Sequence, residues 1–287
     1  MRSASSTAAT VDMEHRQARA SPSALPQRVA SALVLGPLAL VAIWLGPPTV
    51  DALIVAAAAL MGWEWGRLSG LKDGWRGGVL AAFVTAASVV VAAAWSVTAA
   101  LGLLAATAVL LALVAPAVRG HRLGWLAVGV LYIGLPSVAL AWIAADREMG
   151  RATLFWLVAL VWATDTGAYF AGRTIGGRKL APAISPGKTW AGLLGGIAAA
   201  AAVGVATALW TGASPVVLVL VSAMLAVVEQ AGDLLESAFK RHFKVKDSGH
   251  LIPGHGGMLD RLDGLLMAAL AVALIVWIGG ESVLKWR

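Results

Sequence analysis

The sequence predicts an all-α integral membrane protein that crosses the bilayer about nine times, with its N-terminus in the cytoplasm. Of its 287 residues, 59% are hydrophobic and 13% are charged, about half the charged share of a soluble domain. Apolar runs long enough to span the hydrocarbon layer recur along the chain, and Lys and Arg gather in alternate connecting segments. The absence of Cys excludes disulfides, thiol catalysis and Cys-based metal sites.

The chain divides into three parts. Residues 1–28 are rich in Ala, Ser and Arg and contain no apolar run, so we expect a flexible basic tail rather than a signal peptide. N-terminal transmembrane helices follow over 29–150, and a catalytic transmembrane region with cytoplasmic loops at 172–189 and 239–262 occupies 151–287. The predicted spans, nine within a range of seven to ten, lie at about 29–46, 50–66, 78–95, 97–117, 124–144, 153–172, 190–210, 215–238 and 263–280.

The basic residues orient these spans. With the N-terminus in the cytoplasm, the inner segments hold 18 of the 22 Lys and Arg residues and the outer segments hold four. Because cytoplasmic loops are enriched in Lys and Arg, this split predicts that orientation and an odd number of spans. The formal net charge of +7 also indicates contact with anionic headgroups or phosphorylated substrates.

Charged residues inside the spans are costly and therefore mark candidate functional positions. Glu64, in the second span, is interpreted as a residue that pairs with Arg67 or reaches the interface. In the eighth span, the polar residues recur at helical spacing and share one face, which indicates either a polar cavity or an ion-paired contact between helices. The intramembrane acidic residues of the second half are Asp165, Glu229, Asp233, Glu236, Asp260 and Asp263.

Two loops favour the cavity over the packing contact. The first ends in Ser185-Pro186-Gly187-Lys188-Thr189, which resembles half of a P-loop but lacks its full spacing, so a Walker site is rejected. The second combines cations, glycines and carboxylates, a mixture that suits phosphates and Mg²⁺. Asp260 could alternatively cap a helix and Asp263 could face a helix dipole. A zinc role for His255 is not expected, because neither Cys nor another close His accompanies it.

The second loop resembles the signature of phosphatidate cytidylyltransferases, also called CDP-diacylglycerol synthases. Segments 165–169, 179–182, 185–189 and 232–237 also resemble this family, and the likeness covers about the C-terminal 40% of the chain. Leu235 and Glu229 depart from the family pattern, which leaves Glu229 without an assigned role. The matching positions are Ser237, Phe239, Lys240, Arg241, Lys246, Asp247, Gly249, Ile252, Pro253, His255, Gly256, Gly257, Met258, Asp260, Arg261, Leu262 and Asp263.

The resemblance implies an Mg²⁺-dependent attack of phosphatidic acid on the α-phosphorus of CTP, which gives CDP-diacylglycerol and pyrophosphate. The implied cofactor is more than one Mg²⁺ ion, held by Asp233 and Asp260 and then by Asp165 and Asp263. The expected catalytic residues are Asp233, Asp260, Lys240, Arg241, Arg261 and Lys188. The expected substrate-binding residues are Ser185, Lys188, Thr189, Ser237, Lys246, Asp247, His255, Gly256 and Gly257.

The implied partners are CTP, phosphatidic acid and membrane lipids, with no nucleic acid, while a homodimer is left open. A bacterial cytoplasmic membrane is expected, because the Ala-rich, Arg-rich and Lys-poor composition is typical of GC-rich bacteria. The active site is expected on the cytoplasmic side, because the basic residues place both motif-bearing loops there. Two alternatives stay open. One is another CTP-dependent membrane lipid enzyme, such as a lipid kinase or related cytidylyltransferase, and the other is a lipid-phosphate or ion transporter.

Overall fold

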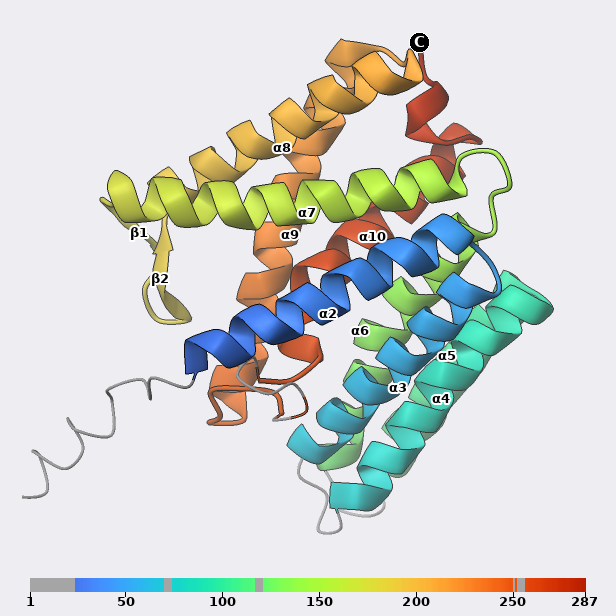
Figure 1. Cartoon of the computed structure of the whole chain (residues 1–287). Coiled ribbons are helices and arrows are strands. Elements are labelled where there is room, and N and C mark those ends of the chain that lie inside the picture. The colour runs from blue at the N-terminus through green and yellow to red at the C-terminus, as the bar shows by residue number, and fades with distance from the viewer. Residues whose placement is uncertain (1–23, 70–73, 117–120, 250, 252–255) are drawn as a thin grey trace, which may run out of the picture.

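Long helices make up almost all of the computed structural model, which describes residues 24–69, 74–116, 121–249, 251 and 256–287 (Figure 1). A short hairpin of strands β1 (Lys179–Ala181) and β2 (Ser185–Thr189) separates α7 from α8, and the 3₁₀ helix η1 (Val283–Lys285) follows α10. The nine helices of the described residues are α2 (Ala24–Leu45), α3 (Thr49–Leu68), α4 (Gly74–Ala94), α5 (Val97–Val114), α6 (His121–Ala144), α7 (Gly150–Thr174), α8 (Trp190–Thr211), α9 (Pro215–His242) and α10 (Leu259–Gly279).

Seven of these helices, α4 to α10, are long and apolar enough to cross a membrane. They confirm the expected all-α polytopic membrane protein. The other two differ for physical reasons: α3 carries three charged residues, Asp51, Glu64 and Arg67, and α2 is apolar over the shorter stretch Leu33–Leu45. The fold therefore combines seven strongly apolar helices with two that lie beside them.

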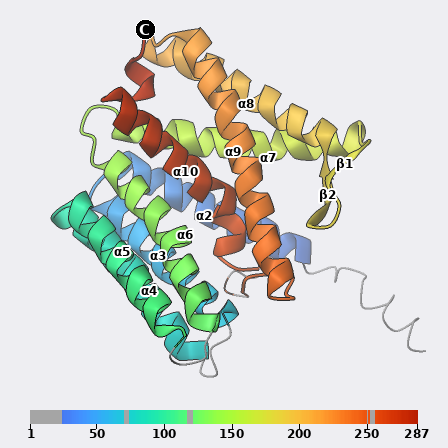
Figure 2. The ribbon, with the colours of Figure 1, turned by 180° about the vertical axis from the view of Figure 1, so that it is seen from behind.

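The helices form two groups that meet along α10. The α3, α4, α5 and α6 helices pack into one bundle, while α7 and α8 lie side by side and α9 crosses them (Figure 1). Seen from behind, α10 runs between α6 and α9 and contacts both (Figure 2). The first turn of α10 contacts Glu64 of α3 and Lys240 of α9, so it lies where the two groups come together.

Glycines allow α7 and α8 to pack closely. A Cβ atom added at Gly167 would lie 2.6 Å from the carbonyl oxygen of Gly195, and one at Gly195 would lie 2.3 Å from the Cβ of Ala171. Small residues let membrane helices approach in this way. The pair holds Asp165 on α7 next to the hairpin that precedes α8.

Aromatic side chains fix the end of α9 against the first bundle. Phe239 meets the buried ring of Trp65 edge-on at 5.0 Å, and Phe243 meets it edge-on at 5.9 Å. The indole Nε1 of Trp65 donates a 2.7 Å hydrogen bond to the carbonyl oxygen of Trp125. Edge-to-face rings of this kind add to the free energy of burial, so the C-terminal end of α9 has a fixed position.

Three boundaries differ from the expected ones. The α2 helix begins at Ala24, so residues 24–28 of the expected tail are helical, while residues 1–23 lie outside the described part. The loop expected over 172–189 contains the β1–β2 hairpin, in which Lys179 pairs with Thr189. In the segment expected as a loop over 239–262, α9 continues to His242 and α10 starts at Leu259, because charged residues can extend a helix beyond its apolar stretch.

The α7–α8 contact can be tested with a pair of glycine substitutions. Gly195→Ala should lower the free energy of unfolding by about 1–3 kcal/mol, because its methyl group would overlap Ala171. Gly102→Ala on α5 is the matched control, since nothing lies within 4 Å of its Cβ position. Thermal unfolding in detergent should show a lower midpoint for Gly195→Ala alone. Equal midpoints for the two variants would contradict the close packing.

Candidate active site

Lys188 is the centre of the first polar cluster. The hairpin carries it to α9, where its Nζ lies 2.6 Å from Oδ2 of Asp233 and donates a 2.9 Å hydrogen bond to Oε1 of Gln230. The Gln230 amide donates in turn to Oε2 of Glu229, at 2.9 Å. The Asp165 carboxyl group on α7 faces Glu229 closely enough to hydrogen-bond with it. A single lysine thus connects three acidic residues of two helices.

Lys240 is the centre of the second cluster. Its Nζ lies 2.5 Å from Oε2 of Glu236, one turn earlier on α9, and 2.8 Å from Oδ1 of Asp260 on α10. The Glu236 side chain is only 1% exposed, and its oxygens have no geometrically good hydrogen bond among the described residues. Lys240 is therefore the group that compensates this buried carboxylate.

The polar face of α9 contains both kinds of residue that its spacing left open, one in an ion-paired contact between helices and one that is accessible. Glu236 behaves as an ion-paired packing contact, since it is buried against Lys240 and α10. Asp233 differs, because 31% of its side chain is exposed beside Lys188. The Ser237 hydroxyl donates to Oδ1 of Asp233 at 3.3 Å. Asp233 is thus both held in place and accessible.

Asp260 organises the segment before α10. Its Oδ2 accepts hydrogen bonds from the Ser248 backbone N–H at 2.9 Å, the Ser248 hydroxyl at 3.0 Å and the Gly257 N–H at 2.8 Å. Since Oδ1 receives Lys240, most of the acceptor capacity of this carboxylate is in use. Asp263, one turn along α10, has only a 2.8 Å bond from the Gly264 N–H and interacts electrostatically with Asp233.

Glu64 is the residue that sequence reasoning misjudged. It neither pairs with Arg67 nor reaches the interface, because it is 2% exposed and points to the start of α10. Its carboxylate accepts hydrogen bonds from the backbone N–H groups of Met258 and Leu259, both at 2.9 Å. The sequence signal that could have identified it is the presence of a carboxylate within a largely apolar segment, where burying a charge is costly.

Two further polar residues of the site were also missed. Gln230 links Lys188 to Glu229 within the first cluster. The Tyr132 hydroxyl on α6 is buried, interacts electrostatically with the carboxylates of α9 and α10, and has no hydrogen-bond partner in the part of the chain that the structure describes. Neither residue stands in a motif, so only the packing of helices reveals them.

Other expected site residues, both catalytic and substrate-binding, have local structural roles. The Thr189 hydroxyl accepts a 3.0 Å hydrogen bond from the Gly192 N–H and so caps α8. Arg241 donates through Nε to the Ile184 carbonyl oxygen at 3.2 Å, which ties the turn of the hairpin to α9. Ser185 starts β2 opposite Ala181. These contacts keep Lys188 at its position beside Asp233.

The rest of the second loop is less closely packed. Lys246 and Asp247 are exposed. Gly256 has a φ of +87°, a backbone conformation that favours glycine, and a Cβ atom there would lie 2.9 Å from Oδ2 of Asp260. Gly257 is buried beside Ser248. His255 lies outside the described residues.

The donor set fits a hard divalent cation by its chemistry. All of its ligand candidates are carboxylate oxygens, which Mg²⁺ prefers, and the carboxylates outnumber the lysines that pair with them. In the described residues, however, no three or more His, Cys, Asp or Glu side chains are close enough to form a ready metal site. Asp165 and Asp263 each interact electrostatically with Asp233, so these three carboxylates lie near one another.

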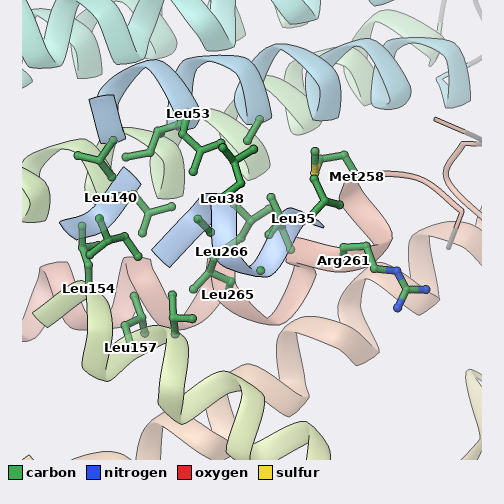
Figure 3. Close-up of a pocket in the computed structure, with 18 of the residues that line it drawn as sticks. Leu35, Leu38, Leu53, Leu140, Leu154, Leu157, Met258, Arg261, Leu265 and Leu266 are labelled. Carbon is green, nitrogen blue, oxygen red and sulfur yellow. The ribbon is translucent and has the colours of Figure 1, made fainter. Parts of the chain in front are cut away.

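An apolar cavity of about 360 Å³ borders this polar centre. It lies between α2, α3, α6, α7 and α10 and is lined mainly by apolar residues, among which leucine is the most frequent, as Figure 3 shows. Arg261 lies at one end, and its guanidinium group points away from the leucines (Figure 3). The same Arg261 interacts electrostatically with Asp165. It therefore belongs to both the apolar cavity and the acidic centre.

Fold and site together describe a helical membrane protein in which lysines and carboxylates adjoin an apolar cavity. The cytidylyltransferase family model matches residues 26–278, so the chain belongs to that family. A phosphatidate cytidylyltransferase of Brucella suis is 38% identical over 262 residues, which cover 87% of this chain and 92% of that protein. The Pseudomonas aeruginosa enzyme of the same name is 39% identical over 268 residues, covering 89% and 98%.

A third relative is similar over a shorter stretch. The phosphatidate cytidylyltransferase of Bacillus subtilis is 41% identical over 148 residues, which cover 50% of this chain and 55% of that protein. The family resemblance of the second loop is thus confirmed by similarity that, in the first two relatives, extends over most of the chain.

The buried ion pair of the second cluster gives a stability prediction. Lys240→Met should lower the free energy of unfolding by about 3–5 kcal/mol, because Glu236 would be left buried without a counter-charge. The double variant Lys240→Met/Glu236→Gln should recover part of this loss. Thermal unfolding in detergent measures both.

A surface ion pair provides the control. Lys285 contacts Glu148, whose side chain is 72% exposed, so Lys285→Met should change the free energy of unfolding by less than about 1 kcal/mol. Equal losses for Lys240→Met and Lys285→Met, or no recovery in the double variant, would show that the buried pair is unimportant.

Proposed function

We propose that this protein is a phosphatidate cytidylyltransferase, which makes CDP-diacylglycerol and pyrophosphate from CTP and phosphatidic acid. The observation that carries the proposal is the position of Arg261 between an apolar cavity and an acidic centre. An enzyme that joins a lipid to a nucleotide needs these two environments side by side. The names of the relatives support the same reaction.

The chemistry requires few groups. A phosphate oxygen of phosphatidic acid attacks the α-phosphorus of CTP, a new P–O–P bond forms, and the bond to the β-phosphate breaks to release pyrophosphate. Phosphate monoesters are largely dianionic near neutral pH, so the nucleophile needs no general base. The main barrier is the repulsion between two polyanions, which the protein can lower by positioning and by positive charge.

The cations of the site suit this task. Lys188 and Lys240 are held next to carboxylates in the starting state and can bind phosphate oxygens when substrates arrive. Arg261 is placed to bind the lipid phosphate at the end of the cavity. Arg241 is exposed near the hairpin turn, where it can meet the nucleotide from the aqueous side.

Mg²⁺ is the cofactor that the carboxylates suit. When bound, it would neutralise triphosphate charge and stabilise the leaving pyrophosphate. Asp165, Asp233 and Asp263 would hold it, while Asp260 keeps the loop before α10 in place through its contacts to Ser248 and Gly257. More than one metal ion is compatible with this number of carboxylates.

We further propose that an acyl chain of the lipid substrate lies in the apolar cavity. The leucine side chains would surround its methylene groups with van der Waals contacts that replace those made in the bilayer. The lipid phosphate would then lie near Arg261, within reach of the acidic centre.

The proposed topology has nine spans and a cytoplasmic N-terminus, with the active site on the cytoplasmic side of a bacterial membrane. Contacts at the other end of the molecule support it, because they join segments that are assigned to the outside. Lys285 contacts Glu148, and the Thr153 and Ser282 hydroxyls lie 3.0 Å apart. The sparse basic residues of that end fit the outer side.

The reaction is tested directly with purified protein, CTP, phosphatidic acid and Mg²⁺. We expect CDP-diacylglycerol and pyrophosphate in equal amounts, and no product when Mg²⁺ is chelated. A lipid kinase would instead release CDP and a newly phosphorylated lipid from a lipid acceptor, and a transporter would leave CTP intact. Either of these results would refute the proposed reaction.

Asp233→Asn should reduce CDP-diacylglycerol formation at least 100-fold while the protein still inserts and elutes as a single species. The physical reason is the loss of an accessible carboxylate that holds both Lys188 and the cation. Glu281→Gln, an exposed carboxylate outside the site, should retain full activity. Near-normal turnover by Asp233→Asn, measured with labelled CTP, would remove Asp233 from the cation site.

A larger side chain in the cavity should weaken the binding of long-chain lipids more than that of short-chain lipids. Leu53→Trp places an indole ring in the cavity and should raise the KM for long-chain phosphatidic acid at least fivefold, with a smaller effect on a short-chain lipid and none on CTP. Leu209→Trp on α8 is the matched control, because Leu209 is 78% exposed on the outer surface. Equal KM values for the two variants would show that the acyl chain binds elsewhere.

A further inference from the structure

Glu64 forms a contact between the two helix groups that the proposed reaction does not itself use. It lies on α3, yet its partners are Ser248, Met258 and Leu259, which are 184 to 195 residues further along the chain. The three donors approach within 2.9–3.1 Å, and the side chain is 2% exposed. The carboxylate is therefore buried and almost fully satisfied by the segment that leads into α10.

The start of α10 explains why an acidic residue is needed. The first N–H groups of a helix have no partner within the helix, and the helix dipole places partial positive charge there. Met258, the residue before α10, has a helical conformation and supplies no capping side chain. Glu64 takes over that role from another helix, because it accepts from the N–H groups of both Met258 and Leu259.

Glycines make room for the Glu64 carboxylate. A Cβ atom at Gly249 would lie 2.7 Å from its Oε1, and one at Gly257 would lie 2.6 Å from its Oε2. The Ser248 hydroxyl lies 3.1 Å from Glu64 and 3.0 Å from Asp260, so it stands between the two carboxylates. The glycines of this loop thus have a structural role, because their lack of side chains leaves room for the carboxylates of both Glu64 and Asp260.

We propose that Glu64 is a positioning residue that holds the first turn of α10, and with it Asp260, Arg261 and Asp263, in the geometry needed for cytidylyl transfer. It acts as a cap supplied by the first helix group to a helix of the second. This inference rests on the proposed function, because its readout is the rate of that reaction. The hydrogen bonds of Glu64 among the described residues are to Ser248, Met258 and Leu259, which is why its role is assigned to positioning.

The test compares conservative variants of Glu64 in the full-length protein. Glu64→Gln keeps the size of the side chain but turns one acceptor into a donor that faces a backbone N–H. Its kcat should fall at least tenfold, with less than threefold change in the KM for CTP. Glu64→Asp retains the charge on a shorter side chain, so its kcat should lie between those of Glu64→Gln and the wild type.

Two further measurements separate positioning from general instability. Hydrogen exchange should be faster for the amides of Met258 and Leu259 in Glu64→Gln and unchanged in α5. Asp51→Asn is the matched control, since it alters a carboxylate on the same helix about 20 Å away, at 1.5 Å per residue, and should leave kcat unchanged.

Glu64→Gln and Ser248→Ala share the Glu64–Ser248 contact, so the loss of activity in the double variant should be smaller than the sum of the two single losses. Ser248→Ala alone also removes the 3.0 Å contact with Asp260, so it is measured beside the double variant. The inference is overturned if Glu64→Gln and Glu64→Asp keep a wild-type kcat, or if exchange rises throughout the protein. If Glu64→Gln does not fold, Glu64→Asp decides the same point, because it should still lower kcat and speed exchange at Met258 and Leu259. Absence of CDP-diacylglycerol formation by the wild type would instead refute the proposed function.

Discussion

The burial of carboxylates between membrane-spanning helices is the constraint on which the rest of this structure depends. Each charge removed from water must be compensated inside the bundle, or the helices separate. Two lysines meet part of this need, Lys188 from the hairpin and Lys240 from α9. A helix N-terminus meets another part at Glu64. The hairpin between α7 and α8 has a clear purpose in this light, since it carries a cation into the acidic centre from outside the helices.

In the part of the chain that the structure describes, not every carboxylate of the site forms an ion pair with a lysine. The proposed reaction would use the carboxylates that do not. Asp165 and Asp263 have no lysine of their own within ion-pair distance among the described residues, and they lie close to Asp233, which adds repulsion. A divalent cation and the phosphates that it brings would relieve this repulsion. Arg261 lies where the apolar cavity meets the polar centre, the two environments that the proposed reaction would need.

The sequence predicted those features that local patterns determine. Apolar runs located the helices to within a few residues, and helical spacing placed Asp233 and Glu236 on one polar stripe. Burial then divided the stripe, because Glu236 meets Lys240 while Asp233 stays accessible. The family signature identified the loop before α10. It did not show that Asp260 accepts backbone hydrogen bonds from that loop.

The Glu64 contact could not be predicted either, because it also joins residues that are far apart in the sequence. Its partner Leu259 lies 195 residues away, and a single sequence contains no signal that joins an isolated glutamate to a distant helix start. Arg67 lies one turn along α3 from Glu64, and this spacing led to the wrong prediction that the two residues form an ion pair. Yet the cost of an intramembrane charge is independent of its neighbours in sequence: a buried Glu64 must find donors somewhere, and a helix N-terminus is the place where backbone donors are always in excess. At Glu64 the cost of burial is therefore met by the start of α10 rather than by Arg67 on its own helix.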